Sequence, residues 1–353
     1  MRSIAITGVS GYLGSVLARL LDGDPSISRI VGIDVAEPAF SARNLEFYSM
    51  DVRSPDLVDV LRGCDTVVHL AAVHQEDADV RDVNVGGTRN VTEAVSRAGV
   101  RKLIFASSHS VYGVHADNDF PLTESSPVRP NVENAYARSK AEAEQVVAFF
   151  ASQHPEAVVT TLRFAWISGP NLPASQARAV DVKVRFVVAG YDVPMQTVHE
   201  DDAAAAVALA IDRDIPGVFN VCADEAVEAP DEILGQRRVV LPLDRARQLL
   251  DRTATVGLSP PGSQIGLLMY PSVMSNDAIT GVGFAPRYTG RAALEAAAAR
   301  RRFMSVGKLH VRRRDAILVG ATAIVALASA MGRRRARRWR DRGSARPRSR
   351  IRR

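Results

Sequence analysis

The feature that most constrains this sequence is a glycine-rich turn that directly follows its first apolar run. Ile4–Thr7 has the length and composition of a buried β-strand, and the motif TGVSGYLG then places Gly8, Gly11 and Gly14 three residues apart. The helical pattern of Tyr12–Leu21 begins inside this motif. A strand, a tight glycine turn and a helix in this order are typical of a fold whose first turn binds a pyrophosphate.

The residues around this turn predict a dinucleotide cofactor. Glycines allow the backbone to approach the pyrophosphate closely, and the free N–H groups at the helix start attract its negative charge. Asp34 ends the second expected strand, Arg29–Asp34, 20 residues after Gly14. Its carboxylate can accept a hydrogen bond from a ribose 2′-hydroxyl and would repel a 2′-phosphate, so we expect NAD rather than NADP. The predicted contacts in this part of the chain are Gly8, Gly11, Tyr12, Leu13, Gly14 and Asp34.

Further apolar runs alternate with helical patterns along the first half of the chain. Strands are expected at 45–50, 66–71, 102–106 and 157–164, and helices at 56–62, 77–98 and 134–153. The runs lack the alternation of half-exposed strands, which indicates a parallel sheet covered by helices on both faces. The predicted fold is therefore α/β, a doubly wound parallel sheet of the Rossmann type.

The chain is expected to have three regions. The first is a Rossmann domain over 1–168, whose sheet is completed by strands from 195–222. The second is a small substrate-binding lobe over 169–303, where five prolines between 223 and 283 predict long loops and short helices. The third is a basic tail over 304–353 with an apolar helix at 316–332.

The ends of the third and fourth strands supply further expected cofactor contacts, because ligands bind at the carboxyl edge of such sheets. These contacts are Asp51 and Val52 after the third strand, and Leu70, Ala71 and Ala72 after the fourth. His69 and His74 lie in the same region. We interpret both histidines as residues that line the pocket rather than as catalytic groups.

A catalytic set is indicated by Ser108, Tyr136 and Lys140. Tyr136 and Lys140 are four residues apart in a helical pattern, so their side chains share one helix face. A phenol is a poor base at neutral pH, and a neighbouring ammonium is expected to lower its pKa. Ser108 ends the fifth strand and can hydrogen-bond to the reacting oxygen. This set can take a proton from a hydroxyl while a hydride leaves for a nicotinamide.

The motifs together resemble those of the extended short-chain dehydrogenases/reductases, the NAD-dependent epimerase/dehydratase family, which includes sugar-nucleotide epimerases, sugar dehydratases and 3β-hydroxysteroid dehydrogenases. The matching segments are TGVSGYLG, VGID, HLAA, NVGGTRNV, ASSHSVYG, YARSK, LRFAWISGP and VHEDDAAAAVALA. The resemblance covers residues 1–222 and continues more faintly to 302. It implies that Ser108 is the catalytic serine, Tyr136 the base and Lys140 its partner, and that Asn84 has a structural or cofactor-side role. It also implies a seven-stranded Rossmann domain with a small C-terminal lobe.

Two departures from the family pattern bear on the substrate. The stretch VPMQTVHEDD has Met195 and Gln196 where epimerases of UDP-sugars commonly carry an arginine, and Arg185 is displaced from that position. His109 and Ser110 follow Ser108 where dehydratases have acidic residues, so oxidoreduction or epimerisation is favoured over dehydration.

We therefore expect an enzyme that exchanges hydride between NAD and a secondary alcohol or ketone of a nucleotide sugar. The alternatives are a hydroxysteroid-dehydrogenase-like enzyme acting on a membrane lipid, and an NAD-binding protein without turnover. The sequence leaves the exact substrate and the formation of a homodimer open.

The charge of the chain is concentrated at one end. From residue 300 onward lie 19 of the 45 basic residues and 2 of the 39 acidic ones, so the remaining body is acidic, which argues against specific nucleic-acid binding. Cys64 and Cys222 have no partner motif and predict neither a disulfide nor a metal site. With no secretory signal pattern, a cytoplasmic location is expected for the body.

The tail predicts contact with a membrane surface. Residues 316–332 form a run of 17 residues without a charge. At about 1.5 Å per residue such a helix would be about 25 Å long, near the short limit for crossing a bilayer. Arginines flank the run on both sides, so we expect 312–340 to bind anionic headgroups with partial insertion of the helix. The alternative is a helix buried in an oligomer, followed by a disordered basic tail.

Overall fold

The computed structural model describes residues 1–74, 79–174, 176–254, 262–300, 303–306 and 309–312, and it divides the chain into two units, 1–298 and 299–353. In the second unit, β12 (Phe303–Val306) and β13 (Leu309–Arg312) pair antiparallel. Among the described helices, none has the length and apolar character needed to cross a membrane. The helix expected at 316–332 lies outside the described residues, so the membrane contact stays a prediction.

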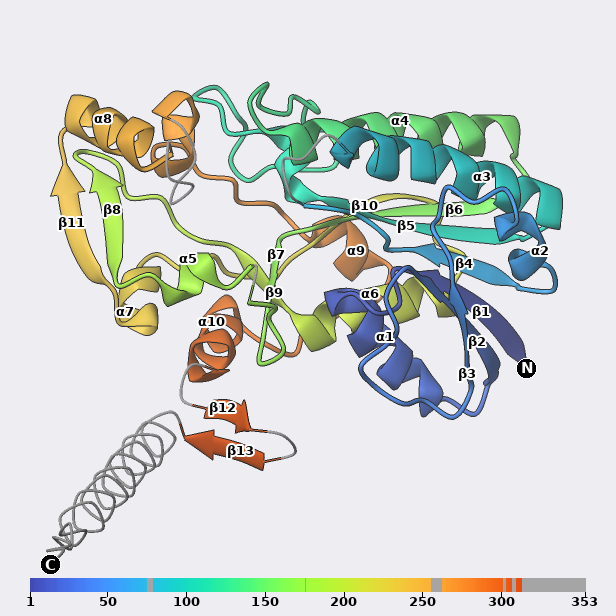
Figure 1. Ribbon diagram of the computed structural model, residues 1–353. Helices are drawn as coiled ribbons and strands as arrows, with labels where there is room; N and C mark the ends of the chain where they lie inside the picture. Colours follow the sequence, from blue (N-terminus) through green and yellow to red (C-terminus); the bar gives the residue numbers. More distant parts are fainter. Residues whose placement is uncertain (75–78, 175, 255–261, 301–302, 307–308, 313–353) are drawn as a thin grey trace, which may run out of the picture. The chain divides into compact units, whose positions relative to one another are not determined.

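The first unit is built around a seven-stranded parallel sheet, as the sequence predicts (Figure 1). The strand order is β10-β6-β5-β4-β1-β2-β3. The strands are β1 (Arg2–Thr7), β2 (Ile27–Asp34), β3 (Leu45–Ser49), β4 (Thr66–His69), β5 (Lys102–Ser108), β6 (Val158–Phe164) and β10 (Gly217–Val221). The order reverses between β1 and β4, which is where ligands bind in doubly wound sheets. The predicted α/β fold class is confirmed.

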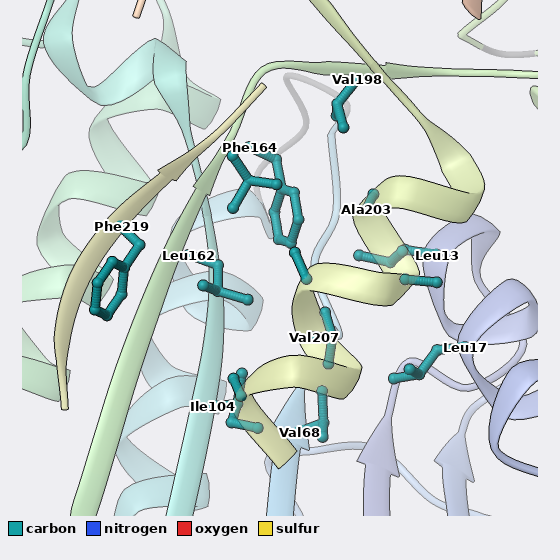
Figure 2. Packing of buried hydrophobic residues seen from close by; sticks show 14 of the residues in the cluster. Leu13, Leu17, Val68, Ile104, Leu162, Phe164, Val198, Ala203, Val207 and Phe219 are labelled. Atoms are coloured by element: carbon teal, nitrogen blue, oxygen red, sulfur yellow. The ribbon is translucent and has the colours of Figure 1, made fainter. Parts of the chain in front are cut away.

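Helices cover both faces of this sheet (Figure 1). On one face lie α1 (Tyr12–Asp22) and α6 (Glu200–Asp212), and on the other α2 (Leu57–Leu61), α3 (Gly87–Ala98) and α4 (Ala135–Gln153). Leu17 of α1 and Val207 of α6 are fully buried in the same cluster as Ile104 of β5 (Figure 2). These strands are apolar on both sides because each face is packed against helices.

The helix expected at 77–98 is described from residue 80 and is not uniform. It contains one π-helical turn, η1 (Asp82–Gly86), directly before α3. Asn84 lies in this turn, and the hydroxyl of Thr88 donates to its backbone carbonyl at 2.6 Å. Single π-helical turns often occur at functional sites, and this one orients a buried amide side chain toward α4.

The C-terminal part of the first unit contributes a smaller set of elements. The strands are β7 (Trp166–Ser168), β8 (Val184–Val188), β9 (Thr197–His199) and β11 (Arg237–Leu241), and the helices are α5 (Arg178–Asp181), α7 (Pro230–Leu234), α8 (Leu243–Ala254), α9 (Asp277–Gly281) and α10 (Gly290–Ala299). β7 pairs with β9 and β8 with β11, both in parallel. The expectation of loops and short helices over 223–283 missed β11 and the 12-residue α8. The β8–β11 pairing joins segments about fifty residues apart, which local pattern alone does not reveal.

The position of α1 depends on the lack of a side chain at Gly14. A Cβ atom on Gly14 would lie 2.1 Å from the carbonyl oxygen of Gly8 and 2.8 Å from Cα of Val9. Both contacts are with backbone, which cannot move aside without shifting the turn or the helix.

We predict that Gly14→Ala lowers the free energy of unfolding by about 2 to 3 kcal/mol, as overpacking of a tight site does. Urea denaturation of the purified protein measures the change. Gly281→Ala is the matched control, because no atom lies within 4 Å of its Cβ position, and it should stay within about 0.5 kcal/mol of wild type. Equal stability of the two variants would contradict the packing argument.

Candidate active site

The carboxyl edge of the sheet brings together the turn after β1 and the end of β2. Thr7 pairs with Ile33 in the β1–β2 register, which places Gly8 beside Asp34. The Asp34 carboxylate accepts hydrogen bonds from the backbone N–H groups of Ser10 at 3.0 Å and Ala36 at 3.1 Å. Asp34 therefore shapes the glycine turn itself, in addition to lying where a ribose is expected.

The glycine turn after β1 leaves a space that a side chain would fill. Gly8 has a φ of 74°, and a Cβ atom there would lie 2.7 Å from the backbone nitrogen of Ala71. Gly11 is the N-cap of α1, and no side-chain hydrogen bond caps the helix. Without a side-chain cap, the backbone N–H groups at the start of α1 are free to bind the pyrophosphate of NAD. The residues present therefore fit this cofactor.

Two predicted contacts in the turn have side chains that are engaged elsewhere. The Tyr12 hydroxyl donates to the Glu200 carboxylate at 2.5 Å. Leu13 is 9% exposed and belongs to the hydrophobic core. Either residue would therefore meet a pyrophosphate through its backbone N–H rather than through its side chain.

The predicted contacts after β3 and β4 lie at the same edge. The Asp51 carboxylate accepts hydrogen bonds from the backbone and guanidinium of Arg53, and Val52 is buried against Gly87. Leu70, Ala71 and Ala72 are half-buried where β4 ends. The side chain of Asp51 is held in place by Arg53, and its contact with the cofactor stays a prediction.

His69 is a structural residue in this fold. It is 1% exposed, and its two ring nitrogens hydrogen-bond to the hydroxyls of Thr7 at 2.7 Å and Thr88 at 3.0 Å. Because the Thr88 hydroxyl donates to Asn84, the Nε2–H of His69 donates to Thr88. Burial, and to a smaller degree the charge of Lys140, lowers the pKa of His69 to about 3. A neutral, fully bonded imidazole agrees with a non-catalytic role for His69, and its burial makes it a support of the strand end rather than a surface that lines the pocket.

Asn84 connects the cofactor side of the edge to α4. Its side-chain oxygen accepts from the backbone N–H of Val73 at 2.9 Å, and its Nδ2 donates to the Val73 carbonyl at 3.0 Å and to the Ser139 hydroxyl at 2.9 Å. Ser139 in turn donates to the Tyr136 carbonyl at 2.8 Å. The loop after β4 is thus tied to the helix turn that carries Tyr136.

The helix α4 places Tyr136 and Lys140 next to the end of β5. Asn134 caps the helix by accepting a hydrogen bond from the backbone N–H of Ala137 at 2.9 Å, which fixes where the first turn begins. Tyr136 therefore lies in the first turn and Lys140 one turn later. With one helix turn between them, Tyr136 and Lys140 lie on the same face of α4, as the sequence spacing predicts.

Ser108 lies where β5 ends and meets Tyr136. It pairs with Phe164 in the β5–β6 register, three positions beyond the last residue that β5 shares with β4. Its hydroxyl accepts hydrogen bonds from the backbone N–H of Ser110 at 3.2 Å and from the Ser110 hydroxyl at 3.0 Å. The Ser108 side chain also acts to lower the pKa of the Tyr136 phenol, which shows that the two side chains lie close together. The structure thus brings two of the predicted catalytic residues near each other.

The pKa of Tyr136 differs from the expectation. Burial raises it to about 12, and the hydrogen bond with Ser108 opposes the shift only in part. The Lys140 ammonium, expected to lower this pKa, donates instead to the Ala106 carbonyl at 2.6 Å and lies 4.8 Å from the centroid of the Phe105 ring. Desolvation of the half-buried phenol is the main cause, and Lys140, whose ammonium bonds to the strand, is not among the groups that shift this pKa.

Sequence reasoning missed the contact between His74 and the catalytic tyrosine. The two rings lie 4.5 Å apart between centroids. His74 is an exposed residue by surface area, but its ring lies against Tyr136, and desolvation there, and then the charge of Lys140, lowers the pKa of its imidazole to about 4. His74 thus covers one face of Tyr136 as a neutral ring.

A cavity of about 400 Å³ lies among the smaller elements, and its lining reaches His109, the residue after Ser108, without including Ser108, Tyr136 or Lys140. It is lined by His109, Val114, Trp166, Arg185, Phe186, Val187, Val193, Pro194, Met195, Gln196, Leu267, Leu268, Tyr270 and Ser272. Most of these side chains are apolar. No sequence pattern pointed to Trp166 or Phe186, which reach the cavity from separate strands.

The polar side chains of this cavity are engaged within the protein. Arg185 donates to Asp231 at 2.6 Å and to the Val193 carbonyl at 2.8 Å. Gln196 exchanges hydrogen bonds with the backbone of Met274 at 2.8 and 2.9 Å. In the described ranges no group of His, Cys, Asp and Glu side chains is placed to hold a metal ion.

Comparisons with known proteins show similarity to enzymes that act on sugars. UDP-glucose 4-epimerase of Streptomyces lividans is 33% identical over 177 residues, which are 47% of this chain and 52% of that protein. L-arabinose 1-dehydrogenase (NAD(P)(+)) of Haloferax volcanii is 34% identical over 182 residues, 47% of this chain and 68% of that protein. The solved structure of MoeE5 with UDP-glucuronic acid and NAD has a TM-score of 0.68 at 23% identity, covering 85% of this chain and 99% of MoeE5.

The profile of one protein family spans the glycine turn, β5 and α4. This is the profile of the NAD dependent epimerase/dehydratase family, which matches residues 4–222 and so more than half of the chain. The resemblance noted in the sequence motifs is confirmed. The protein is therefore a member of the NAD-dependent epimerase/dehydratase family, and an enzyme whose cofactor is NAD.

Proposed function

We propose that the protein exchanges hydride between NAD and a secondary alcohol or ketone, with Tyr136 as the base. The observation that carries the proposal is the meeting of Ser108 and Tyr136 beside Lys140 at the edge of the sheet that holds the glycine turn. Bound NAD supplies the nicotinamide ring that accepts the hydride. The proposed site residues Ser108, Tyr136 and Lys140 do the proton chemistry.

In the proposed mechanism each residue has a step. Ser108 hydrogen-bonds to the reacting oxygen and orients it toward Tyr136. Tyr136 first releases its own proton to solvent, and the positive charge of Lys140 stabilises the phenolate that forms. The phenolate oxygen then accepts the hydroxyl proton as the hydride leaves the substrate carbon. Because burial raises the pKa of Tyr136 to about 12, this stabilisation is needed at neutral pH. His74, a neutral ring against Tyr136, excludes water from one side of the phenol.

A nucleotide sugar is the proposed substrate. The proposal is supported by the sugar-directed relatives and by MoeE5, whose structure contains UDP-glucuronic acid. Arg185 lines the cavity and would be the cation that meets a diphosphate. His109 and Ser110 next to Ser108 offer no carboxylate for an elimination, which favours oxidoreduction or epimerisation.

A second candidate is a neutral, largely apolar substrate such as a hydroxysteroid-like lipid. The observation that favours it is the ion pair between Arg185 and Asp231, which are 18% and 8% exposed in their side chains. A guanidinium already neutralised by a buried carboxylate attracts a diphosphate weakly. The apolar lining of the cavity points in the same direction.

The role of Tyr136 is tested by Tyr136→Phe. The variant lacks the hydroxyl that accepts the proton, so we expect turnover to fall by about a hundredfold to ten-thousandfold. NAD affinity, measured by isothermal titration calorimetry, should stay within about twofold, because the phenol contributes little to cofactor binding. A variant with wild-type turnover would remove Tyr136 as the base.

The cofactor preference is tested by Asp34→Asn. Loss of the negative charge removes the repulsion of a 2′-phosphate, so the ratio of NADP to NAD affinity should rise roughly tenfold, about 1.4 kcal/mol. Asp24→Asn is the matched control, because Asp24 also accepts a hydrogen bond from a backbone N–H two residues on, at 2.8 Å from Ser26. If wild-type protein binds NADP more tightly than NAD, the role given to Asp34 is wrong.

The two substrate classes are separated by UDP as a competitor. For a nucleotide sugar, UDP should raise the apparent KM of the substrate without changing kcat. Arg185→Met should weaken the competition by about tenfold, whereas Arg238→Met, which removes a more exposed arginine of β11, should not. Product analysis must accompany NADH absorbance, because epimerisation leaves no net NADH. No effect of UDP would support the neutral substrate.

A further inference from the structure

Glu144 is a buried carboxylate that the proposed proton transfer does not use. It continues the four-residue spacing of Tyr136 and Lys140 along α4, so the three side chains form one stripe on the helix. The Glu144 side chain is 10% exposed. A carboxylate in such a site is costly unless other groups satisfy it, so its partners indicate what it does.

The partners of Glu144 come from the two strands beneath the helix. The hydroxyl of Ser107, the residue before Ser108, donates to its Oε1. The guanidinium of Arg163 donates to its Oε1 at 3.0 Å and its Oε2 at 2.7 Å. Ser107 and Arg163 are directly paired in the β5–β6 register. The carboxylate is therefore fixed over the strand end that presents Ser108.

Arg163 is itself held in place, so the pair cannot swing away. Its side chain is 6% exposed, and it donates to the Tyr112 hydroxyl at 2.8 Å and the Glu124 carbonyl at 3.3 Å. The Tyr112 hydroxyl donates onward to Asn220 of β10 at 2.7 Å. A chain of buried hydrogen bonds thus anchors the carboxylate to three strands.

We propose that Glu144 is a positioning residue, whose fixed carboxylate keeps the neighbouring Lys140 ammonium charged beside Tyr136. The proposal rests on the proposed function, in which that charge stabilises the Tyr136 phenolate. Glu144 acts through Lys140 and does not touch the substrate.

The other groups around Lys140 do not supply a negative charge. From β4 and the loop after it, His69 and His74 face Lys140 as neutral rings, with their pKa values lowered to about 3 and 4. From β5 come the Ala106 carbonyl and the Phe105 ring. On α4 itself the remaining titratable neighbour is Tyr136, whose raised pKa keeps the phenol neutral at rest.

The positive charge on β6 belongs to Arg163, and Glu144 pairs with it. Glu144 is accordingly the carboxylate whose charge acts on Lys140. Burial lowers the pKa of Lys140 to about 8, and the charge of Glu144 opposes that shift. A lysine with a lowered pKa loses its proton as the pH rises through that value, so removal of the Glu144 charge would move the loss to lower pH.

The test is a direct titration of Lys140 by NMR in the full chain. The protein has four lysines, Lys102, Lys140, Lys183 and Lys308, so carbon-13 labelling of lysine gives few resonances. Lys140→Met identifies the Lys140 signal by its loss. We expect a midpoint near 8 in wild type and a midpoint lower by about one unit or more in Glu144→Gln.

Glu142→Gln is the matched control. Glu142 lies on the same helix, but it is 36% exposed and pairs with Arg81 at 2.8 Å. Its removal should leave the Lys140 midpoint and the turnover unchanged. An unchanged or higher midpoint in Glu144→Gln, or an equal downward shift in Glu142→Gln, would overturn the proposal.

Loss of Glu144 alone leaves Arg163 buried without its counter-charge, which endangers folding. Glu144→Gln/Arg163→Met removes both ends of the pair and keeps the test available if the single variant does not fold. The Lys140 midpoint should fall in the double variant as well. A wild-type midpoint in a folded double variant would contradict the proposal.

Turnover separates this proposal from the proposed function. Tyr136 and Lys140 titrate as a coupled pair, and the active form has Tyr136 ionised and Lys140 protonated. In Glu144→Gln the acid limb of the pH–rate profile should move to lower pH. The plateau rate should fall by a factor similar to the shift in the acid midpoint. A rate loss without movement of the limb would show a merely structural role. If no substrate is turned over, the proposed function fails, while the Lys140 midpoint still decides the role of Glu144.

Discussion

The site depends on one close contact between backbones, where the turn after β1 meets the end of β4. Gly8 approaches Ala71 so closely that a Cβ atom would lie 2.7 Å from its backbone nitrogen, and Gly14 brings α1 equally close to the same turn. This contact fixes the direction of the first helix turn and the place of Asp34 beside it. Cofactor recognition at this edge therefore depends on backbone geometry, and a side chain added at Gly8 or Gly14 would disrupt it.

The proton-transfer side depends on side chains that reach across several elements. Asn84 ties the loop after β4 to the turn of Tyr136, and Glu144 ties the next turns of α4 to β5 and β6. The helix is thus anchored at both ends of the Tyr136–Lys140 pair. Such anchoring explains how a phenol and an ammonium keep their relative positions at a site that burial makes unfavourable for charge.

The sequence was informative where the relevant interactions are local. The glycine spacing, the apolar strands and the Tyr136–Lys140 spacing predicted the parallel sheet and placed the proposed catalytic groups at its edge. The sequence could not supply the pKa values and charge states that depend on groups distant along the chain. The pKa of Tyr136 depends on how far the fold buries the phenol, and the charge that Arg185 offers depends on Asp231, 46 residues away. Glu144 had a visible signal in its spacing, but its partners on β5 and β6 appear only in the fold.

The two halves of the site differ in how freely they can change. The cofactor half uses backbone and a few small residues, so almost any substitution there meets another backbone atom, as at Gly8 and Gly14. The cavity that His109 lines is built from side chains of separate segments, such as Trp166, Phe186 and Tyr270, which can vary one at a time. A fixed cofactor site can therefore serve different substrates through changes in the smaller elements alone. The pairing of Arg185 with Asp231 is one such feature, because it sets the charge offered to a substrate without touching Ser108 or α4.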